Sequence, residues 1–279
     1  MTETRLLLCT DLDRTLIPNG TQAEHPEARK RFSQFCRHHD LTLVYVTGRD
    51  QVLVKQAIKN YQLPTPDFAI TDVGSKIYKI TDQQWSPWEN WDNEIEPDWN
   101  GFSHQQIKTL LSDINSIKLQ ELSKQNTHKL SYYLPISLDH KLVITQIQEK
   151  LQQKGIAASL IWSIDEPKSI GLLDVLPQNA TKLHAIKFLQ LELGYQHDEV
   201  IFAGDSGNDL PVLDSDVRSV LVANASQEIK QAALDLAQRN HCSHALYIAS
   251  NDESNNGNYA AGILQGINHY AADFYSRNQ

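Results

Sequence analysis

The sequence predicts an α/β fold in which a parallel sheet is interrupted by a smaller α+β domain. Short buried-strand segments alternate with helical segments from residue 5 to residue 71. A parallel sheet with helices on both faces produces such a rhythm. The rhythm changes near residue 81 and returns near residue 171. We therefore expect a Rossmann-like core that is formed by two separated stretches of the chain.

The first stretch contains one part of the expected core. Its strands are continuous apolar runs, as is typical where helices cover both faces of a sheet. The expected strands are 5–10, 41–46 and 68–71, and the expected helices are 24–38 and 51–61. Pro26 stands near the start of the first helix, where the missing N–H costs little, and so favours a helix start there.

The insertion begins with a segment, 85–99, that is typical of a loop or short helix at a domain boundary. The tryptophans of this segment are Trp85, Trp88, Trp91 and Trp99. They either pack at the domain junction, which is the more frequent role, or stack on a sugar ring. Further helices are expected at 103–115 and 138–153, and strands at 129–134 and 156–163. This block predicts a small domain with its own sheet.

After the insertion, the segment 171–176 has a buried-strand pattern, and we expect the first sheet to resume there. The remaining expected strands are 200–203 and 219–222, and the remaining helices are 179–193, 226–239 and 258–275. We therefore assign residues 1–80 and 172–279 to the core, and residues 81–171 to the inserted domain.

Composition argues against several classes of partner. The formal net charge is −9, whereas nucleic-acid binding requires clustered Lys and Arg, so no nucleic-acid partner is expected. No apolar run approaches the ~18 residues that span a bilayer, so no membrane partner is expected. Cys9, Cys36 and Cys242 have neither disulfide nor metal-site spacing, and they predict buried thiols in a reducing cytoplasm. An anionic substrate would need a local positive site, such as a metal ion or a lysine.

Two polar signals follow strands of the first stretch. Asp11 and Asp13 come directly after the first strand, and carboxylates this close repel each other unless a cation or a shared proton intervenes. Thr47 and Gly48 follow the second strand, and a hydroxyl with backbone N–H groups at a helix start forms an anion site. Each signal is also compatible with an ordinary polar turn, so neither decides the function alone.

Two further signals follow the insertion. Lys182 stands in the first turn of a predicted helix, where a cation opposes the helix dipole. This cost favours a role such as balancing a phosphate or an aspartate, although an exposed lysine is the simpler alternative. The segment Gly204–Asp209 follows a strand and includes Asp205, Asn208 and Asp209. Its carboxylates suit a hard cation such as Mg²⁺. All four signals stand at carboxyl ends of predicted strands, where open α/β sheets bind ligands.

In their order, and in their division by an inserted domain, these signals resemble those of the haloacid dehalogenase-like hydrolases. The resemblance covers nearly the whole chain. It is greatest with the sucrose-phosphate phosphatase group, which has a large α/β cap between its second and third motifs. Further matching segments are Val73-Gly74, Lys129–Leu134 and Leu173–Pro177. Arg14 departs from the pattern, because such enzymes often have Gly or Asn there.

The resemblance implies a Mg²⁺-dependent phosphatase that forms an aspartyl-phosphate. Asp11 would be the nucleophile, and Asp13 the general acid and base. The implied ligands of Mg²⁺ are Asp11, Asp205, Asp209 and the backbone carbonyl of Asp13. The implied donors to the phosphoryl oxygens are Thr47, Gly48, Lys182 and Asn208. The inserted domain would be a cap that closes over a small phosphorylated sugar, with sucrose 6-phosphate as the first candidate.

Other functions fit parts of the pattern. A phosphomutase shares the core chemistry but returns the phosphate to a sugar, and a broad sugar phosphatase would differ only in specificity. A dehalogenase needs no metal and lacks a carboxylate at the position of Asp13, so the sequence argues against it. A catalytically silent subunit that binds sugar phosphates is disfavoured because every core catalytic position is present.

Overall fold

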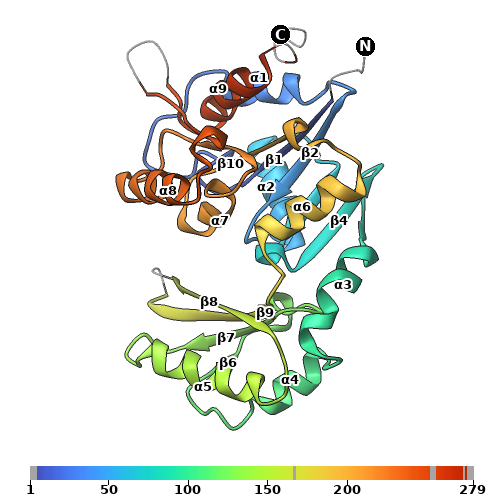
Figure 1. The fold of residues 1–279 in the computed structure, drawn as a ribbon, viewed down its shortest axis with the longest axis vertical. Coiled ribbons are helices and arrows are strands. Elements are labelled where there is room, and N and C mark those ends of the chain that lie inside the picture. The colour runs from blue at the N-terminus through green and yellow to red at the C-terminus, as the bar shows by residue number, and fades with distance from the viewer. Residues whose placement is uncertain (1–4, 166–167, 252–255, 273, 275–279) are drawn as a thin grey trace.

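The computed structural model describes residues 5–165, 168–251, 256–272 and 274, which form a larger and a smaller lobe (Figure 1). The larger lobe contains an eight-stranded sheet in the order β12-β11-β10-β1-β2-β3-β4-β5. Its strands are β1 (Leu6–Thr10), β2 (Leu41–Val46), β3 (Phe68–Thr71), β4 (Lys76–Thr81), β5 (Gln84–Pro87), β10 (Val200–Gly204), β11 (Arg218–Leu221) and β12 (Leu246–Ile248). Strands β12 to β3 run parallel, and the β4–β5 hairpin adds two antiparallel strands at one edge.

Helices cover both faces of this sheet because successive residues of its central strands point to opposite sides. Leu6 and Leu8 of β1 pack with α1 (Ala28–Phe35), α2 (Gln51–Tyr61) and α9 (Ala260–Tyr270). Leu7 and Cys9 pack on the other face with α3 (Glu89–Ile95), α6 (Lys182–Glu192), α7 (Leu210–Leu213) and α8 (Gln227–Arg239). All five residues of β1 are buried, as the apolar run in the sequence predicts.

The smaller lobe contains a four-stranded sheet in the order β6-β7-β9-β8. Its elements are β6 (Lys118–Leu119), β7 (Leu130–Leu134), β8 (Ala158–Asp165), β9 (Ile170–Pro177), α4 (His104–Leu110) and α5 (His140–Gln152). Figure 1 shows α4 and α5 on the side of the sheet away from the larger lobe. Alternate residues such as Leu130, Leu173 and Val175 pack with these helices, so the intervening residues face the larger lobe.

The expected strand at 171–176 exists, but its assignment to the first sheet is wrong. It forms β9, which pairs with β7 and β8 in the smaller sheet. Only alternate residues of β9 pack on the helices of the small lobe, whereas a core strand is buried on both faces. The β4–β5 hairpin also carries the larger sheet beyond residue 81. We propose that the core and the inserted cap meet near residues 88 and 178.

The other expected strands and helices agree with the structure to within a few residues, and the tryptophan-rich segment contains α3. Residues 273 and 275 of the expected helix 258–275 lie outside the described residues. Trp91 and Trp99 are fully buried, which confirms the packing role, and Trp88 stacks on Phe68 at a centroid distance of 5.1 Å. Cys9 and Cys242 are buried thiols, whereas Cys36 is partly exposed. Among the described residues, every helix is too short or too polar to cross a bilayer.

Candidate active site

The four polar segments meet at the carboxyl edge of β1, β2 and β10. Asp11 directly follows β1, and its N–H donates to the carbonyl of Ala203 in β10 at 2.8 Å. Asp205 directly follows β10, and Thr47 directly follows β2. Parallel pairing of these strands therefore brings together residues that are far apart in the sequence.

Lys182 lies at the centre of this group. Its Nζ donates to Asp11 Oδ1 at 3.1 Å, Asp209 Oδ1 at 2.7 Å and Asn208 Oδ1 at 3.2 Å. Thr181 caps α6 by accepting the N–H of His184, so the helix start holds Lys182 toward the carboxylates. Lys182 is buried, and its three acceptors exclude the alternative of an exposed surface lysine.

The loop after β10 holds two buried carboxylates. Asp209 Oδ2 accepts the N–H groups of Asp205 and Ser206, both at 3.1 Å. Asp205 Oδ1 accepts the hydroxyl of Thr15 at 3.1 Å. Asp205 Oδ2 is buried and has no hydrogen-bond partner among the described residues, although Arg14 Nε lies 3.4 Å away. The loop therefore leaves one carboxylate oxygen open to a ligand.

Burial and mutual repulsion make these carboxylates difficult to ionise in the absence of a cation. Burial raises the pKa of Asp11 to about 8; the charge of Lys182 opposes this rise, and the charges of Asp209 and Asp205 add to it. Burial and the charge of Asp209 raise the pKa of Asp205 to about 6. For Lys182, burial would lower the pKa, but the charges of Asp11 and Asp209 outweigh it and raise the pKa. The site holds more negative charge than one lysine balances.

Asp13 lies in a different environment from Asp11. Arg49 donates to both of its oxygens, from Nη2 to Oδ1 at 2.6 Å and from Nε to Oδ2 at 2.7 Å, and Asn19 donates to Oδ1 at 2.7 Å. Burial alone would raise the pKa of Asp13, but the hydrogen bonds and charge of Arg49 lower it below its ordinary value. The pKa of Asp11 is therefore raised, whereas the pKa of the nearby Asp13 is lowered.

A tight turn joins two of the predicted phosphate-binding segments. Its residues Asp72 and Val73 have positive φ values of 51° and 61°, and the N–H of Val73 donates to the carbonyl of Thr47 at 3.2 Å. The next residue, Gly74, packs against the backbone of Thr181 and Lys182. Thr47 is itself fully buried, whereas Gly48 is exposed.

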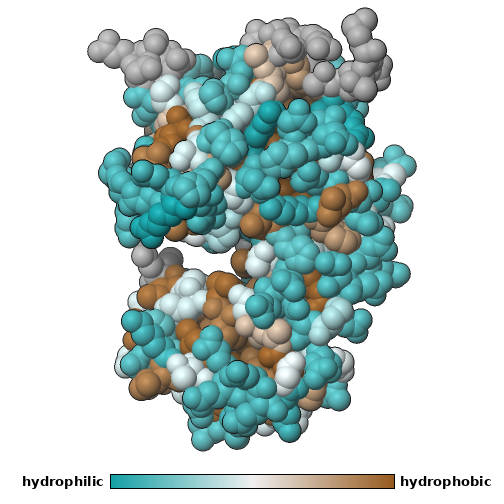
Figure 2. Space-filling view, viewed as in Figure 1, coloured by the Kyte–Doolittle hydropathy of each residue, from teal (hydrophilic) through white to brown (hydrophobic). Residues whose placement is uncertain are grey.

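A cavity of about 610 Å³ lies between the lobes and opens onto these segments. Gly48, Ser206 and Asn208 line its core side, and Lys129, Ser131 and Asp174 are among the residues of its cap side. Figure 2 shows that the surface is hollowed between the two lobes. A molecule bound in this cavity would contact both lobes.

One cap segment is attached to the core beside this cavity. Lys129 Nζ lies 2.9 Å from Asp72 Oδ1, and Lys124 Nζ lies 3.2 Å from Asp50 Oδ2. The first of these ion pairs is almost completely buried, so breaking it would be costly. The structure therefore describes the lobes in contact across one side of the cavity.

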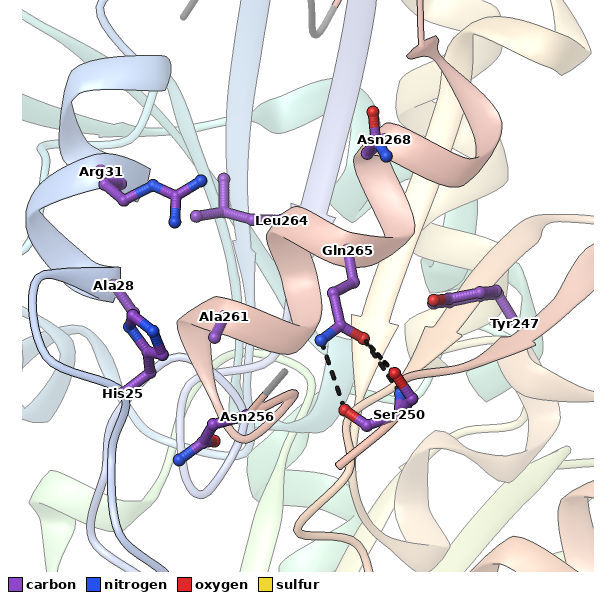
Figure 3. Close-up of a pocket in the computed structure, with 10 residues that line it drawn as sticks. All are labelled: His25, Ala28, Arg31, Tyr247, Ser250, Asn256, Ala261, Leu264, Gln265 and Asn268. Carbon is purple, nitrogen blue, oxygen red and sulfur yellow. Dashed lines mark hydrogen bonds between the residues drawn. The ribbon is translucent and has the colours of Figure 1, made fainter. Parts of the chain in front are cut away.

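A second pocket, of about 380 Å³, lies between α1, α9 and β12 (Figure 3). Its lining includes Arg31, Asn268 and Gln265, and the side-chain amide of Gln265 bonds to Ser250. None of its lining residues belongs to the four polar segments. We therefore place the candidate active site in the cavity between the lobes.

The structure brings together most of the residues expected from the sequence: Asp11, Asp205, Asn208, Asp209 and Lys182. Sequence reasoning missed the roles of Arg49 and Thr15, which contact Asp13 and Asp205 respectively. Arg49 directly follows Thr47-Gly48, and this position in a predicted site segment could have indicated a role for it. It also missed Asp174, which faces the cavity only because β9 belongs to the smaller sheet.

Comparison with known proteins agrees with this geometry. The family model for sucrose-6F-phosphate phosphohydrolase matches residues 4–271. A protein of Nitrosococcus oceani that is named as a HAD-like hydrolase is 49% identical over 267 residues, which cover 95% of this chain and 72% of that protein. Sucrose-phosphatase 1 of Nicotiana tabacum is 28% identical over 283 residues, which cover 95% of this chain and 59% of that protein. The chain thus spans about three fifths of the length of this plant relative.

A solved structure supports the same relationship. The sucrose-phosphatase of Synechocystis sp. PCC6803, determined in complex with sucrose and phosphate, superposes with a TM-score of 0.71 at 26% identity. The match covers 95% of this chain and 98% of that chain. Because the family model extends over nearly all of the sequence, the chain belongs to the sucrose-6F-phosphate phosphohydrolase family of phosphoric monoester hydrolases.

Proposed function

We propose that this chain hydrolyses the phosphate ester of a sugar through an aspartyl-phosphate on Asp11, with sucrose 6-phosphate as the first candidate substrate. The observation that carries the proposal is the buried cluster of Asp11, Asp205 and Asp209 around Lys182. Asn208 connects this cluster to the cavity between the lobes, because it accepts from Lys182 and lines that cavity. In this proposal the cluster binds the phosphoryl group, and the cavity binds the sugar.

The chemistry of the cluster fits Mg²⁺. Carboxylate oxygens of Asp11, Asp205 and Asp209 lie within 4.8 Å of one another, and Mg²⁺ prefers such hard oxygen ligands. The buried Oδ2 of Asp205 has no hydrogen-bond partner among the described residues, as expected of a ligand atom. We propose that Asp11, Asp205 and the backbone carbonyl of Asp13 hold the ion, which would neutralise charge on the carboxylates and the phosphate.

Asp209 has a second role in this proposal. Its Oδ1 accepts from Lys182, and its Oδ2 accepts from the backbone of Asp205 and Ser206. Both oxygens are thus engaged within the protein, although they remain close to the other carboxylates. We propose that Asp209 chiefly positions Lys182 and the loop that carries Asp205.

The residues of the chain can carry out both steps of the reaction. A carboxylate oxygen of Asp11 attacks phosphorus while the bond to the leaving oxygen breaks, and Asp13 gives that oxygen a proton. Asp13 then takes a proton from water, which attacks the phosphoryl group, releases phosphate and restores Asp11. Thr47, Gly48, Lys182 and Asn208 are the proposed donors to the phosphoryl oxygens.

Arg49 is suited to the second of these steps. It lowers the pKa of Asp13 and so favours the basic form that activates water. The first step requires Asp13 to carry a proton, which the bidentate pair with Arg49 disfavours. In this proposal, substrate binding therefore loosens the Arg49–Asp13 pair.

Steady-state kinetics on a panel of phosphate esters would test the proposal. We expect kcat/KM for sucrose 6-phosphate or mannosylfructose phosphate to exceed that for glucose 6-phosphate and p-nitrophenyl phosphate at least ~10-fold, about 1.4 kcal/mol of transition-state binding. If glucose 6-phosphate equals the disaccharides, a broad sugar phosphatase replaces this proposal. Phosphate release that requires a bisphosphate activator would instead indicate a phosphomutase.

A further inference from the structure

The face of the smaller sheet that lines the cavity carries a paired serine and aspartate. Ser131 of β7 stands opposite Asp174 of β9, and its hydroxyl donates to Asp174 Oδ1 at 2.5 Å. Among the described residues, Asp174 Oδ2 receives no hydrogen bond, although the side chain is partly buried. A carboxylate oxygen that lies at a cavity and has no protein donor can accept a hydrogen bond from a ligand.

The neighbouring cation favours the ionised form of Asp174. Lys129 is held beside the cavity by its ion pair with Asp72 at 2.9 Å. Burial raises the pKa of Asp174 above its ordinary value, while the charge of Lys129 and the hydrogen bond from Ser131 oppose that rise. The hydrogen bond from Ser131 thus fixes the orientation of the carboxylate at the cavity wall.

The other charged residues that line this cavity form ion pairs. Lys124 lies 3.2 Å from Asp50, and Lys168 lies 3.0 Å from Asp165. Within the described part of the chain, each lysine of the lining therefore has a carboxylate partner. A leaving group with a second anionic group would find no unpaired lysine there, whereas a neutral polyol could supply the donor for Asp174.

We propose that Asp174 is a specificity-determining residue that accepts a hydrogen bond from a hydroxyl of the leaving group and selects against a second negative charge in it. The inference rests on the proposed function, because it concerns the same cavity. Ser131 acts as a positioning residue in this arrangement, because it fixes the carboxylate from the adjacent strand.

The test compares Asp174→Asn with the matched control Asp165→Asn, a lining carboxylate at the end of β8 whose lysine partner, Lys168, lies three residues further along the chain. We expect Asp174→Asn to lower kcat/KM for the best sugar phosphate of the panel at least ~10-fold, as loss of a used hydroxyl contact does. Activity on p-nitrophenyl phosphate, which lacks sugar hydroxyls, should stay within about twofold. Asp165→Asn should leave both activities within about threefold, since exposed ion pairs contribute little.

An anionic leaving group provides a second readout. Asp174→Asn should reduce the preference for sucrose 6-phosphate over glucosylglycerate phosphate, whose leaving group carries a carboxylate. A merely structural role would lower all activities together and would not change this ratio. Ser131→Ala keeps the carboxylate and should lower kcat/KM less than Asp174→Asn does, again only for sugar phosphates. If Asp174→Asn does not fold, Ser131→Ala provides the test of the proposal.

The outcomes separate the two proposals. A wild-type enzyme with no preference for sugar phosphates over p-nitrophenyl phosphate refutes the proposed function before any variant is made. A wild-type preference that survives in Asp174→Asn, or a loss that is equal for every substrate, refutes the assignment of Asp174 alone.

Discussion

Gly74 offers a quantitative test of how closely the core packs behind Lys182. Its φ is 102°, and a Cβ at this position would lie 2.6 Å from the carbonyl carbon of Thr181 and 3.0 Å from the backbone nitrogen of Lys182. A left-handed backbone costs a residue with a Cβ about 1–2 kcal/mol, and overpacking costs about 1–3 kcal/mol. We expect Gly74→Ala to lower the free energy of unfolding by about 2–5 kcal/mol.

Gly194 supplies the matched control. Its φ is 68°, and a Cβ there would meet no heavy atom within 4 Å. Gly194→Ala should therefore cost only the backbone term, about 1–2 kcal/mol. Urea unfolding of both variants measures the difference, and kcat should fall only in Gly74→Ala, because the displaced backbone carries Lys182. Equal losses of stability in the two variants would show that Gly74 is not packed as described.

Three further predictions concern the carboxylate cluster. Asp11→Asn should fold normally and lose essentially all turnover, and more than a few per cent of residual activity with Mg²⁺ would exclude Asp11 as the nucleophile. EDTA should abolish phosphate release and Mg²⁺ restore it, whereas Ca²⁺ should inhibit because its larger coordination shell misplaces the nucleophile; full activity in EDTA would contradict the metal assignment. In the metal-free protein the pKa of Asp205 is raised from 3.8 to about 6, so its contribution to stability is complete below about pH 4 and is lost as the pH rises through about 6. Thermal unfolding between pH 4 and 7 should show a steeper decline in the wild type than in Asp205→Asn, where Asp11, whose pKa is raised to about 8, still contributes.

The sequence was most informative where a local pattern determines the structure. The strands 41–46 and 68–71 and the helix 51–61 are found with those limits, because apolar runs and helical periodicity are local properties. The positions of Asp11 and Asp205 also followed from the sequence, since the carboxyl ends of parallel strands share one edge of a sheet. Lys182 instead reaches the site from the start of α6, because the strand before it belongs to the smaller sheet.

Tertiary pairing could not be predicted in the same way. The segment 171–176 was recognised as a strand, but nothing in its own residues specifies which sheet it joins. Because the segment was assigned to the larger sheet, the position of Asp174 at the cavity could not be predicted. The bidentate ion pair between Arg49 and Asp13 likewise forms only because β1 and β2 lie side by side. A single sequence does not reveal such a contact.

The division of the core by the cap has a consequence for biosynthesis. Leu7 of β1 stands opposite Val200 of β10, so one edge of β1 lacks its partner until the whole cap and α6 have been translated. At about 5–20 residues per second, this delay is on the order of 10–40 s. The strands β6 to β9 are contiguous in the sequence, so the cap can complete its sheet on the ribosome while β1 remains an unpaired apolar edge. We therefore expect soluble yield in expression to depend on chaperones and temperature through the core rather than through the cap.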